Sequence, residues 1–445
     1  MSHRLRRLWQ HPRYSMQVWL HRLLFWAGAV MVAVAAVSFE WLSSHGSALF
    51  KLALSWSPLL ALIITPAGFV LVLWLTRRVF PGAQGSGIPQ TIAATKLAHA
   101  EDRNAVLSLR IAVGKVVLTT IGLCAGASIG REGPTVQVGA AIMHTLGRWV
   151  RIPIQGIERT LILAGGAAGV AAAFNTPLAG VVFAIEELSR SFEERTSGTV
   201  LTTVIIAGIT AIALMGNYTY FGHTSATLEL ATAWKPVLIC GIGGGVIGGA
   251  FTRVLLAFAR GLPGLMGGAI KTHPYAFAGL CGLGVALLGL ISGNSIYGTG
   301  YEEARSILEG TSTLPGGFGV LKMLASALSY ISGIPGGIFA PSLSIGAGLG
   351  GSLAPYLPAV PLGALAILGM VGYFTGVVQA PITAVVIVME MTDGQALTLP
   401  LLATAMLAFG ASRLVNTQPM YRTLAQSFLG THSAPAPEEK TPGQK

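Results

Sequence analysis

The sequence predicts an all-α polytopic membrane protein, and its composition and its apolar runs carry that prediction. Of the 445 residues, 52% are hydrophobic and only 10% are charged, whereas soluble chains carry about 25% charged residues. Too little charge is present to cover a soluble surface, so lipid is the expected solvent. Apolar runs that approach the roughly 20 residues needed to cross a bilayer recur along the whole chain. They are Leu23–Val37, Leu59–Leu75, Val200–Met215, Val237–Phe251 and Leu362–Val378.

The net charge of +11 is placed as in a membrane protein and not as in a nucleic-acid-binding one. Four arginines between residues 4 and 13 precede the first apolar run, and Arg77 and Arg78 close the second. Basic segments that flank spans stay in the cytoplasm. We therefore expect a basic cytoplasmic N-terminus over residues 1–18, in a multi-pass protein of the cell (inner) membrane.

Two pairs of similar segments indicate that the chain consists of two related halves. Segment 134–140 (Pro-Thr-Val-Gln-Val-Gly-Ala) resembles segment 341–347 (Pro-Ser-Leu-Ser-Ile-Gly-Ala), 207 residues later. Segment 177–186 resembles segment 381–390 in the same way, 204 residues later, and both end in Glu. The alternative is that all membrane helices punctuated by Gly and Pro look alike. Repeated halves commonly meet at a binding site near the bilayer midplane.

The repeats and the polarity of the chain suggest boundaries for these halves. We expect a first transmembrane half over residues 19–216, a more polar linker over 217–234 and a second transmembrane half over 235–430. The Pro-, Glu- and Lys-rich residues 431–445 have the composition of a disordered tail.

Three Gly-rich segments interrupt the apolar pattern, and each leads into a proline that can open a helix. They are Gly85–Pro89, Gly130–Pro134 and Gly336–Pro341. A helix N-terminus presents free N–H groups and about half a positive charge, which suits an anion. Three such starts converging in a membrane would hold a small anion without a Lys or Arg that binds it too tightly. The alternative is three ordinary loops.

Acidic residues in apolar surroundings are costly inside a membrane, which makes them candidates for function. Glu132 stands in the second Gly-rich segment, beside the expected helix start. Its carboxylate is itself an anion, so it could compete with a transported ion, leave when protonated and carry the proton. The structural alternative is a static ion pair with Arg131.

Further charged residues close or interrupt apolar segments. Glu186 and Glu187 end the helix expected from Pro177, for which Asn175 or Thr176 would be the cap. Neighbours on a helix point about 100° apart, so one carboxylate would face the interior and the other water. Both could instead mark the membrane edge, and Glu390 at the matching place of the second half could be structural. Lys115, in the apolar stretch Ile111–Leu123, tunes the anion site or pairs with a carboxylate.

Together these segments resemble the CLC family of chloride channels and chloride/proton exchangers, from about Arg22 to Ala425. The three Gly-rich signatures in this order carry the resemblance, and Ala171–Gly180, Ala380–Thr392 and Pro419–Tyr421 also fit the family. The resemblance implies a CLC-type fold of two inverted-repeat halves with broken and re-entrant helices. It also implies a homodimer with one anion pathway in each subunit.

The resemblance also implies a set of site residues. The hydroxyls of Ser86 and Tyr421 and the backbone N–H groups of Ile338 and Phe339 would contact the central chloride, beside Gly87 and Ile88. Backbone N–H groups around Arg131 and Gly133 would line an outer site. Glu132 matches the external gating glutamate and Glu187 the internal proton-transfer glutamate, whereas Lys115 and Glu186 remain candidates for tuning.

The expected function is secondary active exchange of chloride for protons across the membrane, with the glutamate gate competing for the anion site. Typical channel members of the family carry an uncharged residue at the position of Glu187, so this residue favours an exchanger. The alternative is a passive, voltage- or pH-gated chloride channel of the same fold. No nucleophile–base pair or metal-ligand cluster stands in the apolar segments, so we expect no enzyme activity, metal ion or cofactor. Chloride, protons and the lipid bilayer are the expected partners, and nucleic acid is not.

Overall fold

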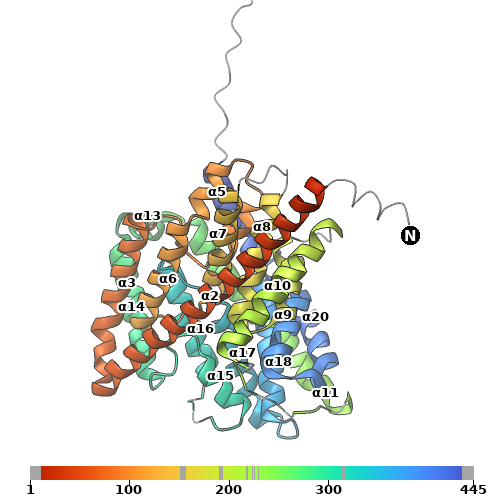
Figure 1. Ribbon diagram of the computed structural model, residues 1–445. Coiled ribbons are helices and arrows are strands. Elements are labelled where there is room, and N and C mark those ends of the chain that lie inside the picture. Colours follow the sequence, from red (N-terminus) through yellow and green to blue (C-terminus); the bar gives the residue numbers. More distant parts are fainter. Residues whose placement is uncertain are drawn as a thin grey trace, which may run out of the picture.

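The computed structural model describes residues 12–150, 157–189, 194–216, 219–222, 224, 226–228, 230–312, 314 and 316–432. In this part of the chain the secondary structure is helical, and the only β-type pairing is an isolated bridge between Gly130 and Gly337. The prediction of an all-α protein is therefore confirmed (Figure 1).

The first half of the chain contains one very long helix followed by shorter and broken ones. These elements are α2 (Pro12–Trp56), η1 (Pro58–Leu60), α3 (Ala61–Arg78), α4 (Ile88–Ala94), α5 (Ala100–Val106), α6 (Leu109–Cys124), α7 (Glu132–Val150), α8 (Ile157–Phe174), α9 (Pro177–Phe183), the π-helical turn η2 (Ala184–Ser189) and α10 (Glu194–Met215).

The second half contains a comparable series. Its elements are α11 (Leu230–Leu238), the π-helical turn η3 (Ile239–Gly243), α12 (Gly244–Arg260), α13 (Gly264–Thr272), α14 (Pro274–Ile291), α15 (Tyr301–Leu308), α16 (Phe318–Ile331), α17 (Phe339–Gly351), η4 (Ala354–Tyr356), α18 (Leu362–Val378), α19 (Pro381–Thr392), η5 (Gln395–Leu397), α20 (Thr398–Val415) and α21 (Met420–His432).

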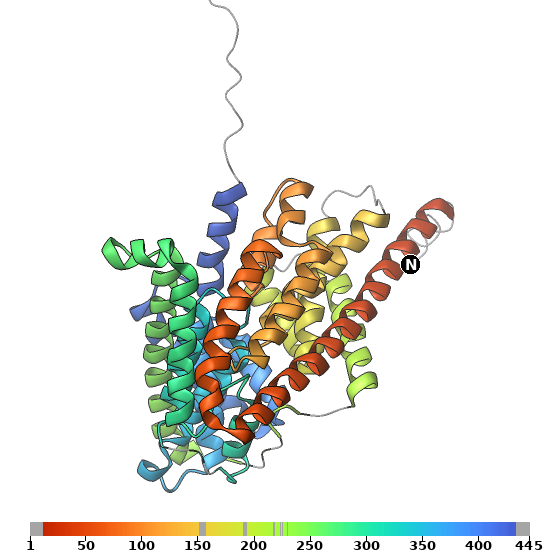
Figure 2. The same ribbon diagram turned by 90° about the vertical axis from the view of Figure 1, so that its left-hand side faces the viewer.

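Eight helical segments of the described residues are long and apolar enough to cross a membrane. The longest helix, α2, has 45 residues, which corresponds to roughly 68 Å and exceeds the thickness of the hydrocarbon core. Figures 1 and 2 both show it as an oblique rod across the molecule. The eight segments are Trp19–Trp56, Pro58–Arg78, Ala100–Cys124, Ile157–Phe174, Gly198–Met215, Thr232–Arg260, Pro274–Ile291 and Gln395–Val415.

The largest buried cluster surrounds α18. Residues 363–378 of this helix are all buried, as expected for a helix that is apolar on every face. Ile88 of α4, Phe339 of α17 and Tyr421 of α21 belong to the same cluster. The core therefore packs directly against the starts of three helices that carry predicted site residues.

Equivalent helices of the two halves pack in the same way. The backbones of α7 and α8 touch where a Cβ on Gly139 would lie 2.2 Å from the Gly165 carbonyl oxygen. In the second half, a Cβ on Gly346 would lie 2.5 Å from the Gly369 carbonyl oxygen, between α17 and α18. Small residues allow such close approach of membrane helices. These two contacts lie at the offsets of the sequence repeat, 207 residues for Gly139 and 204 for Gly165.

The ends of α9 and α19 cap each other. The Glu390 carboxylate, near the end of α19, accepts hydrogen bonds from the N–H groups of Leu178 (3.1 Å) and Ala179 (2.6 Å) at the start of α9. The Glu186 carboxylate, just past the end of α9, accepts from Ile382 (3.2 Å) and Thr383 (2.6 Å) at the start of α19. Each helix therefore meets the other head to tail, and the predicted inverted relation of the halves is confirmed.

These reciprocal caps correct one expectation from the sequence. Thr176 is the N-cap of α9, but its side chain makes no capping hydrogen bond, and the Asn175 side chain donates to the distant carbonyl oxygen of Gly216. The free N–H groups at the start of α9 are satisfied by a carboxylate more than 200 residues away (178 to 390). The suggestion that Glu390 is structural agrees with this geometry.

The domain boundaries remain predictions. α11 begins at Leu230, inside the segment 217–234 that we interpret as a linker, and residues 217–218, 223, 225 and 229 of it lie outside the described residues. Most of the basic N-terminus (1–11) and most of the predicted tail (433–445) also lie outside them.

Replacing Glu390 with Ala tests the reciprocal cap. We expect the free energy of unfolding to fall by about 1–2 kcal/mol, because two N–H donors at a helix start lose their acceptor. Reversible unfolding in mixed detergent micelles, followed by circular dichroism, measures this change. Glu309→Ala is the matched control, since that carboxylate lies in an exposed i,i+4 pair with Arg305 and should contribute under about 0.5 kcal/mol. Equal stability of the two variants would contradict the cap.

Candidate functional site

The three Gly-rich segments lie together in the structure. The Gly336 N–H donates to the Gly85 carbonyl oxygen at 3.2 Å, which joins the first segment to the third. Gly130 and Gly337 exchange two hydrogen bonds of 2.6 and 2.7 Å, which join the second to the third. The helices that follow, α4, α7 and α17, begin at Ile88, Glu132 and Phe339. Three helix starts therefore meet at one place in the core.

Ser86 and Tyr421 are among the hydroxyl groups near these helix starts that are buried without a hydrogen-bond partner among the described residues. Ser86, next to the αL residue Gly87 (φ 101°) that caps α4, is 1% exposed, and Tyr421 of α21 is fully buried. α21 packs against α4, and a Cβ on Gly133 would lie 3.3 Å from the Ser86 Cβ. Buried polar groups are nearly always paired, so these two hydroxyls fit a polar ligand that the protein itself does not supply.

The backbone adds further donors. Ile338 is the N-cap of α17 and Phe339 its first residue, and both are buried. The first N–H groups of a helix have no acceptor within that helix. The aromatic ring of Phe339 packs against Phe174 and Phe374, at centroid distances of 5.1 and 4.4 Å, which fixes this helix start in position.

Both predicted proton-transfer carboxylates are buried. Glu132 is 1% exposed as the first residue of α7, and Glu187 is fully buried in the π-helical turn η2 that follows α9. Glu187 therefore lies inside the protein and not on its surface.

The repeat separates structural carboxylates from the other two. Glu186 and Glu390 are equivalent and make equivalent caps (offset 204). The residue equivalent to Glu187 is Met391, which is 1% exposed, and the residue equivalent to Glu132 is Phe339 (offset 207). Because the second half packs with apolar residues at these positions, the fold itself does not require carboxylates there.

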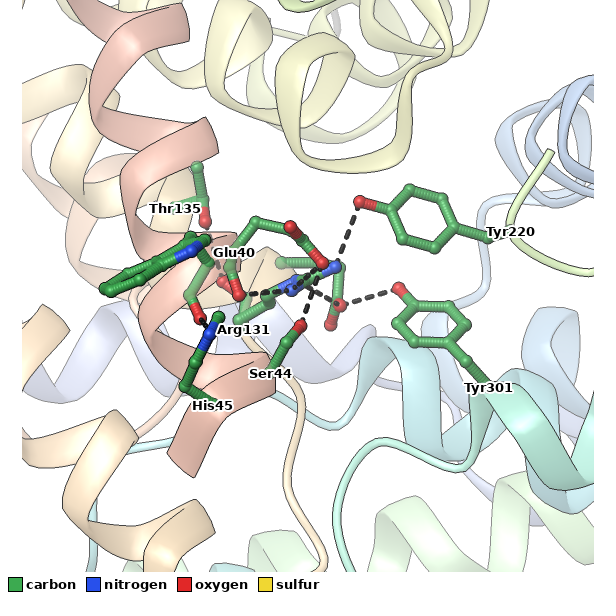
Figure 3. A network of polar contacts seen from close by, with 9 residues as sticks. Glu40, Ser44, His45, Arg131, Thr135, Tyr220 and Tyr301 are labelled. Atoms are coloured by element: carbon green, nitrogen blue, oxygen red, sulfur yellow. Dashed lines mark hydrogen bonds and ion pairs between the residues drawn. The ribbon is translucent and has the colours of Figure 1, made fainter. Parts of the chain in front are cut away.

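Arg131 contacts groups other than the neighbouring glutamate. Its guanidinium donates to the Glu40 carboxylate at 2.8 Å and to the Tyr220 hydroxyl at 2.9 Å, and it lies over the rings of Tyr220 and Tyr301 (Figure 3). The Arg131 Nε atom is 4.0 Å from Glu132 Oε1, beyond hydrogen-bond distance. The structure therefore favours Glu40, and not Glu132, as the close ion-pair partner of Arg131.

The two tuning candidates have local partners. The Lys115 ammonium group is buried in α6 and donates to the carbonyl oxygens of Gly85 (2.8 Å) and Gln84 (3.2 Å), directly before Ser86, and not to a carboxylate. It thereby holds the backbone of the first Gly-rich segment. The Glu186 carboxylate accepts the hydrogen bonds that cap the start of α19, as described above.

Sequence reasoning missed three side chains beside Glu132. They are Glu40 of α2 and the stacked pair Tyr220 and Tyr301, whose ring centroids are 4.8 Å apart. They line a cavity of about 240 Å³ together with Arg131. The Tyr301 hydroxyl donates to Glu132 Oε1 at 2.6 Å. A signal was present for Tyr301, because Gly298-Thr299-Gly300-Tyr301 is a fourth Gly-rich segment that opens a helix.

Comparison with known proteins assigns the family. Residues 67–413 match the family model described as voltage gated chloride channel, which covers most of the chain. The chain belongs to the CLC family. The resemblance seen in the Gly-rich signatures is thereby confirmed, and this CLC protein is a multi-pass membrane protein that transports anions.

Solved CLC structures have the same fold. A slow cyanobacterial Cl⁻/H⁺ antiporter is 27% identical with a TM-score of 0.76, covering 95% of this chain and 100% of its own. A CLC-type fluoride/proton antiporter is 24% identical with a TM-score of 0.76, covering 90% and 96%. A eukaryotic CLC transporter is 20% identical with a TM-score of 0.72, covering 91% and 74%. The last two comparisons speak for the fold alone.

Proposed function

We propose that this CLC protein exchanges chloride for protons across the cell membrane. The observation that carries the proposal is the pair of buried hydroxyls, Ser86 and Tyr421, that have no partner in the described protein and lie by converging helix starts. The likeness to a cyanobacterial antiporter supports the same function. A chloride ion would accept hydrogen bonds from both hydroxyls and from the Ile338 and Phe339 N–H groups.

The donors at this site are neutral, which suits transport. The buried cation Lys115 is bonded to the backbone carbonyl oxygens directly before Ser86 and acts on the site through the segment that it holds. Partial charges at helix starts attract an anion less strongly than a full charge in contact with it. The anion can therefore leave to either side.

In the proposed cycle two glutamates move the proton. The Glu132 carboxylate competes with chloride at the helix starts, and protonation makes it neutral and releases it. Glu187 passes protons from the cytoplasmic side toward Glu132. The apolar equivalents, Met391 and Phe339, support a functional and not a structural reason for these two carboxylates.

The proposal includes an orientation and an assembly. The N-terminus is cytoplasmic, since Arg13 at the start of α2 and Arg77 and Arg78 at the end of α3 lie at the same face of two consecutive spans. The protein forms a homodimer in the cell (inner) membrane, with a separate pathway in each subunit.

The test uses purified protein in liposomes with a chloride gradient and no proton gradient. We expect chloride to drive uphill proton movement, seen as a change in external pH that stops when the chloride gradient is removed. Chloride flux without proton movement would mean a passive channel of the same fold. Absence of chloride flux in a correctly folded sample would contradict both functions.

Replacing Ser86 with Pro tests the central ligand. We expect the preference to shift from chloride toward nitrate by roughly tenfold. The direction follows from the nitrate-selective relatives, which carry Pro at this position, and the size from the loss of one hydrogen bond to a charged ligand, which corresponds to about 1.5–3 kcal/mol. Competition between the two anions for uptake into liposomes measures the ratio. Ser44→Ala is the control: it removes an exposed serine hydroxyl that donates to the Glu40 carboxylate and is not a predicted chloride ligand. Unchanged selectivity in Ser86→Pro would remove Ser86 from the ligand set.

A further inference from the structure

The Glu132 carboxylate is held by a residue outside the three signature segments. Its Oε1 atom accepts a hydrogen bond of 2.6 Å from the Tyr301 hydroxyl, and its Oε2 atom has no hydrogen-bond partner among the described residues. Neither oxygen therefore accepts an N–H group from the start of α7 or α17. In this structure Oε1 is bonded to Tyr301, whereas Oε2 lies against Gly130, next to the first turn of α17, without accepting a hydrogen bond from it.

The Tyr301 ring is fixed on several sides. It stacks on Tyr220 at 4.8 Å, and the Phe221 ring lies 5.2 Å away. The guanidinium of Arg131 lies over both tyrosine rings, and Glu40 and the Tyr220 hydroxyl hold it in place (Figure 3). These contacts fix the Tyr301 ring, so its hydroxyl cannot move with the Glu132 carboxylate when the carboxylate changes position.

The loop that carries Tyr301 is fixed as well. Lys322, fully buried in α16, donates to the carbonyl oxygens of Ile296 and Gly298, each at 2.8 Å. Gly300 has φ 86°, and a Cβ there would lie 2.3 Å from the Ser344 hydroxyl oxygen. A buried lysine and a required glycine thus set the position at which α15, and Tyr301 with it, begins.

We propose that Tyr301 is a positioning residue that holds the Glu132 carboxylate away from the helix-start donors and so leaves the anion site open to chloride. This inference rests on the proposed function, in which Glu132 and chloride compete. The position bonded to Tyr301 and the position at the helix starts are two alternatives for one carboxylate. Their relative population sets how often chloride finds the site open.

A hydrogen bond to a charged group shifts such an equilibrium by about tenfold. The apparent affinity of a ligand falls in proportion to the fraction of molecules that can receive it. In Tyr301→Phe, which keeps the ring and its stacking, the carboxylate would spend more time at the helix starts. We expect chloride to bind more weakly to this variant, by a factor of up to about ten.

The test measures chloride binding to purified protein by isothermal titration calorimetry in wild type, Tyr301→Phe, Glu132→Gln and the double variant. Glutamine is neutral and does not compete as an anion, so Tyr301→Phe should have no effect in the Glu132→Gln background. Tyr297→Phe is the matched control: Tyr297 lies on the same loop before α15, but its hydroxyl donates at 3.3 Å to the Ala286 carbonyl oxygen of α14, so this variant should leave affinity unchanged.

Three results would overturn the inference. They are wild-type affinity in Tyr301→Phe, an equal loss in the Glu132→Gln background, and tighter binding in Tyr301→Phe. The last would mean that the tyrosine holds the carboxylate in the anion site. If wild type binds chloride and couples it to protons while Tyr301→Phe behaves like wild type, only this inference fails. If wild type and Glu132→Gln bind no chloride at all, the proposed function fails.

Discussion

Glu132→Gln should still carry chloride while proton movement falls to the leak of protein-free liposomes. Glutamine has the shape of the protonated acid, so it neither competes with chloride as an anion nor takes up a proton. Its amide oxygen can still accept the hydrogen bond from Tyr301. A chloride electrode and a pH electrode in the same liposome suspension separate the two fluxes.

The control for this variant is Glu302→Gln, which removes a carboxylate from the lining of the same cavity. That carboxylate is 80% exposed and pairs with Lys51. We expect its proton and chloride fluxes to stay in the ratio of the wild type. Chloride-driven proton movement that persists in Glu132→Gln would contradict the role of Glu132 as proton carrier.

Glu187→Ala should also uncouple proton flux from chloride flux, in this case by removing the proposed cytoplasmic entry for protons. We expect chloride-driven proton movement to fall at least about tenfold while chloride flux continues, because proton transfer by a positioned side chain contributes on the order of 10²–10⁴-fold. The anion ligands Ser86 and Tyr421 are unchanged in this variant. The same paired electrode measurement, made without an initial proton gradient, records the loss.

A second substitution distinguishes proton transfer from packing. Glu187→Met introduces the residue found at the equivalent position, Met391. It replaces the buried carboxylate with an apolar side chain of similar length. It should lose proton movement as Glu187→Ala does, with stability at least equal to wild type. Normal coupling in either variant would leave Glu187 as a helix-end carboxylate with no part in exchange.

The fold class could be predicted from the sequence because membrane spans are recognised from the composition of short stretches of neighbouring residues. The Gly-rich segments were equally visible, since Gly followed by Pro marks a helix start wherever it occurs. The structure then placed Gly85, Gly130 and Gly337 in one hydrogen-bonded group. Local chemistry was sufficient for these features.

Contacts that join distant parts of the chain could not be predicted in the same way. Thr176 is a reasonable cap by local rules, but Glu390 takes that role from the other half. Tyr301 lies 169 residues from Glu132, and its hydroxyl reaches the carboxylate only once α15 has packed against α17 and α18. The close ion-pair partner of Arg131 is likewise distant in the sequence, because Glu40 belongs to a helix 91 residues earlier.

The reciprocal bonds between the halves have a consequence for biogenesis. The N–H groups at the start of α9 are bonded to Glu390, and Gly130 is bonded to Gly337. These hydrogen bonds cannot form until more than 200 further residues have been synthesised. At about 5–20 residues per second, this delay is roughly 10–40 s. During that interval the inserted first half carries unpaired N–H groups inside the bilayer, where each costs several kcal/mol. A chain stalled in mid-synthesis is therefore a natural substrate for membrane chaperones and proteases.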